Sequence, residues 1–114
     1  MGFKSDYSFD VRQNESTKIM TKYPTKIPVI VEKYKDCHLH EIDKKKYLVT
    51  KDLLMNQFLF IIRKRINLDP SQSLFITVNN QMCPSNSSIF DIYEKYSDKD
   101  GFLYIVYTSE NTFG

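Results

Sequence analysis

The order of elements in this chain is decided by residues 47–65, which read YLVTKDLLMNQFLFIIRKR. The first three residues, Tyr47-Leu48-Val49, form a short apolar run typical of a strand. Residues at the spacing of one helix face then follow: the apolar Leu54, Phe58, Ile61 and Ile62, and the charged Arg65 at the end of the face. We expect Thr50 to cap this helix, with Asp52 near its positive end. The stretch therefore predicts a strand followed directly by a long amphipathic helix.

Patterns on either side complete the order. Apolar residues at helical spacing predict a helix before Pro24. Strands are predicted at 27–31, 74–78 and 102–107. A short helix capped by Ser88 is predicted before the last of these strands. The polar stretch 33–46 has no helical period, which argues against a ferredoxin-like sheet because that fold needs a helix there. Two strands, a long helix and two more strands is the order of the α+β β-grasp, the ubiquitin roll, here with a four-stranded mixed sheet.

The amino-acid composition limits which classes of function are open to this chain. The chain has 114 residues, enough for one domain, and 16 basic against 14 acidic side chains give a net charge of +2. This charge predicts no general affinity for nucleic acid or anionic membrane. Two cysteines are typical of a reducing compartment, and the longest apolar run is far short of a membrane span of roughly 20 residues. We expect a cytosolic protein.

Few residues can support catalysis. The three glycines are dispersed, so no phosphate-cradling loop is present. His38 and His40 lie with Cys37 and Glu41 in the polar stretch, and their spacing matches no closed zinc site, so an exposed loop without metal is expected. Cys83 lacks a nearby base. These observations predict a protein without catalytic machinery or cofactor.

Seven blocks in order resemble the ubiquitin-like autophagy modifiers, the family of the GABA type A receptor-associated protein and the microtubule-associated light chains. The blocks are Lys22-Tyr23-Pro24, Ile27 to Lys33, Ile42 to Val49, Phe58 to Ile66, Val78-Asn79-Asn80, Ile92 to Tyr96, and Asp100 through Glu110-Asn111-Thr112-Phe113-Gly114. The resemblance covers the whole chain. It implies a single ubiquitin-like domain over 1–114, with two additional helices in an N-terminal extension (1–24), a β-grasp (25–108) and a flexible conjugation tail (109–114).

The resemblance also implies covalent attachment. In this family the terminal glycine, matched by Gly114, is joined to phosphatidylethanolamine by an activating and a conjugating enzyme, and a cysteine protease processes and releases the protein. A glycine suits this step because its extended backbone enters a narrow catalytic cleft. The implied localisation is cytoplasmic when free and the cytosolic face of autophagosomal or vesicle membranes when lipidated.

A second implied activity is recognition of cargo receptors through aromatic-x-x-aliphatic motifs, which add a strand beside residues 46–50. The matching residues of the aromatic pocket are Glu15, Ile19, Pro28, Ile30, Lys46, Leu48 and Phe102. Those of the aliphatic pocket are Tyr47, Val49, Leu53, Phe58 and Ile61. Lys26, Lys44, Lys46 and Arg65 are expected to meet acidic residues that flank such motifs.

Three residues depart from the family pattern. Thr50 replaces a common proline, Lys26 a common arginine, and Thr77 an aromatic residue on which a second, helix-binding surface of the family depends. Alternatives to the implied function are a modifier joined to protein lysines, an adaptor that is never conjugated, and a basic binder of RNA or membrane surfaces.

Overall fold

The computed structural model describes residues 2–109, in which helices and strands follow one another as a β-grasp with an N-terminal extension. The helices are α1 (Phe3–Asp6), α2 (Phe9–Lys22), α3 (Met55–Arg65) and α4 (Ile89–Tyr96). The strands are β1 (Lys26–Lys33), β2 (Lys46–Thr50), β3 (Phe75–Val78), β4 (Gln81–Met82) and β5 (Leu103–Thr108). No helix in this part of the chain is both long and apolar enough to cross a bilayer.

The strands form one mixed sheet in the order β2-β1-β5-β3-β4. Its centre is the parallel pair β1 and β5, in which Val29 lies opposite Leu103, and the other pairs are antiparallel. The expected number of strands was wrong by one, because β4 adds a fifth strand of two residues. It follows a tight turn at Asn79 and Asn80, both with positive φ, and its exposed side chains give no apolar pattern from which to predict it.

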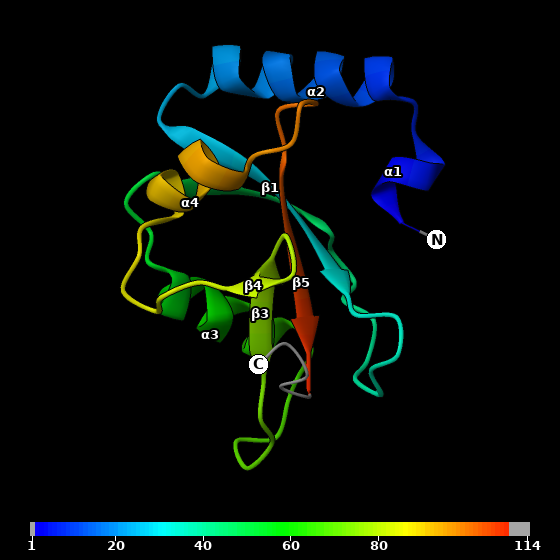
Figure 1. Ribbon diagram of the computed structural model, residues 1–114, viewed down its shortest axis with the longest axis vertical. Coiled ribbons are helices and arrows are strands. Elements are labelled where there is room, and N and C mark those ends of the chain that lie inside the picture. Colours follow the sequence, from blue (N-terminus) through cyan, green and yellow to red (C-terminus); the bar gives the residue numbers. More distant parts are fainter. Residues whose placement is uncertain (1, 110–114) are drawn as a thin grey trace.

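Side chains of β1 alternate between two cores. Ile27, Val29 and Val31 face the main core, where they pack with Phe58 and Ile62 of α3. The side chain of Ile30 points to the other face and packs under α1 with Phe3 and Phe102. The sheet is therefore covered on both faces around β1 and β5, and Figure 1 shows α2 lying across one end of these strands with α1 turned down beside them.

The start of α3 differs from the sequence prediction. Thr50 does not cap the helix: it is the last residue of β2, opposite Lys26. Its backbone is committed to the sheet, so the chain turns once more, and the helix begins at Met55 after Leu54. The amide of Leu54 donates to the Gln57 side chain at 2.9 Å. The expected cap of α4 is confirmed, since the Ser88 hydroxyl accepts a hydrogen bond from the Asp91 amide.

Gly101 is required where α2 meets the sheet. Its φ is +92°, and a Cβ built there would lie 2.3 Å from the Ser16 hydroxyl oxygen and 3.0 Å from the Ser16 Cβ. A side chain at this position would therefore be strained in its backbone and would push α2 away.

We expect Gly101→Ala to lower the free energy of unfolding by about 1–3 kcal/mol, measured by urea denaturation. Gly2→Ala is the matched control, because Gly2 has a negative φ and its added methyl would meet only the end of the Glu32 side chain. Equal losses in both variants would contradict this explanation of Gly101.

Candidate functional site

The open edge strand β2 has a different environment on each face. It pairs with β1 on one side, and within residues 2–109 no strand lies on its other side. Tyr47 and Val49 point into the main core beneath α3. Leu48 points to the face that carries α2 and is 39% exposed. An extended peptide added to this edge would thus meet apolar groups above and below the sheet.

The structure brings the residues predicted for the aromatic pocket together on the α2 face. Ile19 packs against the small core that contains Ile30 and Phe102. Pro28 lies opposite Leu48 in the β1–β2 ladder. The remaining two residues, Glu15 of α2 and Lys46 of β2, form an ion pair that joins the helix to the edge strand.

The residues predicted for the aliphatic pocket lie on the α3 face, where most of them belong to the core. The rings of Tyr47 and Phe58 meet edge to face, with centroids 5.7 Å apart. Leu53 packs against the same cluster, whereas Ile61 is 37% exposed. Ile61 and Leu53 therefore offer accessible apolar surface, backed by buried Phe58.

One buried side-chain polar atom on this face, the Tyr47 hydroxyl, has no hydrogen-bond partner within the described residues. Burial raises the pKa of this phenol, although the charge of Arg65 acts in the opposite direction. The hydroxyl therefore stays protonated at neutral pH and able to donate a hydrogen bond.

Three of the predicted basic residues, Lys44, Lys46 and Arg65, lie near the start of β2, whereas Lys26 lies opposite its end. Two of the four are already engaged. Lys46 pairs with Glu15, and Arg65 donates from Nε to Asp43 at 2.9 Å. The ammonium group of Lys44 lies 5.1 Å from the centre of the Tyr47 ring. Lys26, half-buried, begins β1 opposite Thr50. An acidic ligand would have to compete with the internal carboxylates for Lys46 and Arg65.

A buried carboxylate that sequence reasoning missed fixes α2 above the sheet. Asp100 has no exposed surface, and its Oδ2 accepts from Arg12 Nη1 at 2.6 Å and from the Tyr104 hydroxyl at 2.5 Å. Its Oδ1 accepts from the Phe102 amide at 2.9 Å, and the Ser16 hydroxyl donates to its carbonyl. Burial, and then the bond to Asp100, raise the pKa of Tyr104, which therefore remains a donor. These contacts set the position of the helix that carries Glu15 and Ile19.

Weaker contacts hold α1. The Lys4 ammonium pairs with Asp98 at 2.5 Å and lies 4.7 Å from the centre of the Tyr104 ring. The Phe3 amide donates to Glu32 at 2.7 Å. Burial would raise the pKa of Asp98, but hydrogen bonds from Lys4 and from the Asp100 amide outweigh it and hold this pKa below its usual value.

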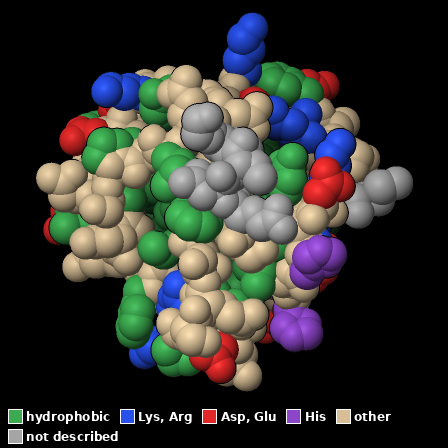
Figure 2. All heavy atoms as spheres, turned by 60° about the horizontal axis from the view of Figure 1, so that its bottom comes forward, with side chains coloured by type: hydrophobic (Ala, Val, Ile, Leu, Met, Phe, Trp, Pro, Cys, Tyr) green, Lys and Arg blue, Asp and Glu red, His purple; other side chains and the backbone are tan. Residues whose placement is uncertain are grey.

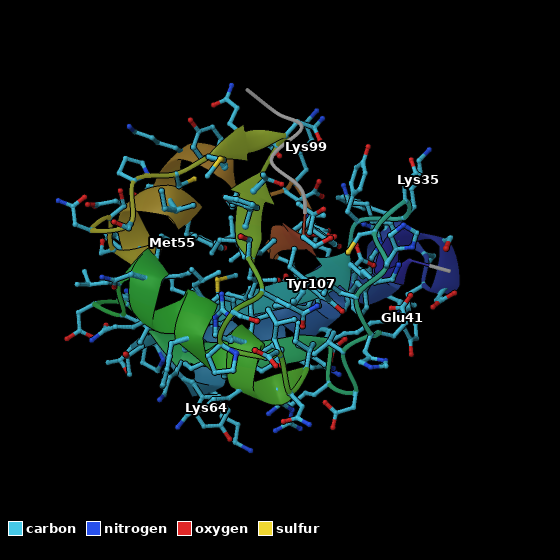
Figure 3. The ribbon with its side chains drawn as sticks, turned by 90° about the horizontal axis from the view of Figure 1, so that it is seen from below. Lys35, Glu41, Met55, Lys64, Lys99 and Tyr107 are labelled. Atoms are coloured by element: carbon cyan, nitrogen blue, oxygen red, sulfur yellow. The ribbon has the colours of Figure 1, made fainter. Side chains whose placement is uncertain are left out.

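The loop between β1 and β2 corrects one expectation. Cys37 is buried, not exposed: its sulfur accepts a hydrogen bond from the Leu39 amide at 3.3 Å. His38 and His40 do lie at the surface, and Figure 2 shows the two histidine side chains, in purple, near one margin of the molecule. The Tyr107 hydroxyl anchors the loop by donating a hydrogen bond to the His40 carbonyl. In Figure 3, Tyr107 lies between Glu41 and α3. Among the described residues no three His, Cys, Asp or Glu side chains are placed to share a metal.

Other predicted features stay outside this site. Thr77 is buried in β3, opposite Val106, so its side chain adds little to any surface there. Burial raises the pKa of Cys83, the opposite of what an activated thiol needs. Gly114 and the tail residues 110–113 lie outside the described residues.

Comparisons with known proteins agree with this architecture. A family model described as "Autophagy protein Atg8 ubiquitin like" matches residues 11–114. Autophagy-related protein 8 of Candida glabrata is 48% identical over 112 residues, which are 98% of this chain and 95% of that protein. The crystal structure of Trypanosoma brucei ATG8 has a TM-score of 0.92 and 38% identity, covering 100% of this chain and 98% of its own. Plasmodium falciparum Atg8, solved in complex with a Plasmodium falciparum Atg3 peptide, has a TM-score of 0.89 and 36% identity, covering 96% and 97%.

The fold and these likenesses define a ubiquitin-like protein of autophagy, which confirms the α+β β-grasp prediction and the resemblance noted in the sequence. The chain belongs to the Atg8 family.

The lowered pKa of Asp98 predicts a pH dependence of stability. A carboxyl whose pKa is lower in the folded protein than in the unfolded chain stabilises the fold above the unfolded value, about 3.9, and loses this effect as pH falls through the folded value. We expect Asp98→Asn to lower the melting temperature at pH 6, and we expect this difference to shrink as the pH falls below the unfolded value of about 3.9. The exposed Asp52→Asn variant serves as control; the same pH profile in both variants would exclude the Lys4 contact as its cause.

Proposed function

We propose that this chain is an autophagy modifier that is joined through Gly114 to phosphatidylethanolamine and recruits proteins with aromatic-x-x-aliphatic motifs. The observation that carries the proposal is the open edge of β2, with accessible apolar side chains on both sheet faces and basic residues at its start. The chain contributes binding groups and an attachment point, and other proteins contribute the catalysis.

Peptide docking is supported by the geometry of this edge. A peptide strand beside β2 would extend the sheet by backbone hydrogen bonds and direct alternate side chains towards Leu48 on one face and Ile61 on the other. An aromatic anchor that buries about 150–250 Å² at about 25 cal/mol per Å² gains roughly 4–6 kcal/mol before the costs of ordering. This supports micromolar, reversible binding.

Attachment is supported by family membership, since the family model extends to Gly114. The proposed partners are the activating enzyme, the conjugating enzyme and a cysteine protease that processes and releases the modifier. The complex of the Plasmodium Atg8 with an Atg3 peptide supports a conjugating-enzyme partner. We place the free protein in the cytoplasm and the conjugate on the cytosolic face of autophagosomal or vesicle membranes.

The docking site can be tested with two exposed residues, whose loss should leave the core intact. We expect Leu48→Ala with Ile61→Ala to weaken binding of an acid-flanked Trp-x-x-Leu peptide about tenfold or more, or about 1.4 kcal/mol, in a calorimetric titration. Met82→Ala, an exposed change on β4 at the opposite edge of the sheet, should bind normally. Unchanged affinity in the folded double variant would move the docking site away from β2.

Attachment can be tested separately from docking. Gly114→Ala or deletion of Gly114 should abolish conjugation to phosphatidylethanolamine liposomes in a system reconstituted with the conjugating enzymes, and should leave peptide affinity unchanged. A product joined to protein lysines instead of lipid would favour the protein-modifier alternative. Conjugation that persists without Gly114 would refute the proposed attachment point.

A further inference from the structure

The floor of the aromatic pocket is already covered by an aromatic side chain of the same protein. Ile30 and Phe102, the deepest of the predicted pocket residues, both have 0% of their surface exposed. They form a small core with Phe3 of α1, which is itself only 7% exposed. A peptide side chain could reach these two residues only after something that covers them has moved.

Phe3 makes the kind of contact that an aromatic anchor would make. Its ring meets Phe102 edge to face, with centroids 5.3 Å apart and planes at 72°. The neighbouring Tyr104 ring is 6.4 Å away. Its backbone amide donates to the Glu32 carboxylate. Buried edge-to-face contact with Phe102 is thus available either to Phe3 or to a ligand ring of similar size.

Of the two helices over this floor, α1 is the easier to displace. It is a single turn of four residues that runs into an extended Tyr7, and the Lys4–Asp98 pair that holds it is partly exposed. By contrast, α2 is fixed by the buried contacts of Arg12 and Ser16 with Asp100. Movement of α1 can therefore uncover Phe102 without disturbing Glu15 and Ile19.

The structure also has open space beside α1. A hollow of about 750 Å³ lies between α1, α2 and the residues that lead into β2. It is lined by Phe3, Asp6, Tyr7, Glu15 and Lys44 to Lys46. It adjoins the Glu15–Lys46 ion pair at the margin of the aromatic pocket. Phe3 itself lines this hollow, so free volume lies next to the side chain that would have to move.

From these contacts we infer that α1 is an intramolecular competitor of the peptide, with Phe3 occupying the floor of the aromatic pocket in the free protein. The inference rests on the proposed peptide-binding function. The apparent dissociation constant then equals the intrinsic one divided by the fraction of molecules in which α1 is displaced. Contacts that hold α1, such as Lys4 with Asp98, lower the affinity for partners although they lie outside the pocket.

The test is a calorimetric titration of wild type and Phe3→Ala with a Trp-x-x-Leu peptide that has neutral flanks, and with the same peptide carrying Ala at both anchors. If α1 is displaced in about a third to a tenth of free molecules, Phe3→Ala should bind about three- to tenfold more tightly. Lys4→Ala, which keeps the Phe3 ring but removes the ion pair between α1 and Asp98, should bind more tightly than wild type by a smaller factor. Met82→Ala should match wild type.

The outcomes separate the two proposals. If wild type binds in an anchor-dependent manner but folded Phe3→Ala binds equally or more weakly, Phe3 is a wall of the pocket and the competitor model is wrong. If neither protein shows anchor-dependent binding, the proposed docking function itself fails.

A second measurement follows Phe3 directly. The chain has no tryptophan, so Phe3→Trp introduces a single fluorescent reporter. Saturation with a Phe-x-x-Leu peptide should shift its emission to longer wavelength, as the ring leaves the apolar floor for water. Binding by calorimetry with no change in emission would overturn the inference even if the affinities agreed with it.

Discussion

The arrangement of this protein depends on one buried carboxylate. A charge without exposed surface is tolerated only if its lone pairs are matched by donors, and Asp100 obtains them from Arg12 of α2, from Tyr104, and from the backbone of Phe102. The donors come from both ends of the chain, so the same contacts that satisfy the charge join the N-terminal extension to the β-grasp. Gly101 completes the junction, because only a residue without a side chain lets Ser16 approach so closely.

This junction gives the sheet edge its two-sided character. A ubiquitin-like sheet with one helix layer would leave Leu48 over open solvent, whereas α2, held by Asp100, places Ile19 and Glu15 on the same face of the sheet as Leu48. On the other face α3 supplies the exposed Ile61, and Phe58 of the same helix meets the Tyr47 ring. The site proposed here is therefore a property of the docked extension and the β-grasp together, and neither part alone presents it.

The sequence predicted those features that depend only on residues close together along the chain. The run Ile27 to Val31, the apolar spacing around Phe58 and the Ser88 cap each identify an element from its own residues. Prediction failed where a distant partner decides the structure. Thr50 would suit a helix cap, but its pairing with Lys26 keeps it in β2. Asp100 resembles a solvated turn residue until Arg12 is placed beside it, and Cys37 lies in a polar stretch yet is buried. No local signal reveals that Phe3 packs on Phe102.

The parallel pairing of β1 with β5 has a consequence for how the molecule is made. The two central strands are the first and last of the sheet, so most of its pairing is non-local and is expected to form slowly. While β5 is absent, β1 and β3 each have an open apolar edge, the kind of surface through which partly folded chains associate. Asp100 and Gly101 lie in the turn that leads through Phe102 into β5, and Ser16 of α2 donates to the Asp100 carbonyl there. Defects there would first appear as aggregation during synthesis or refolding.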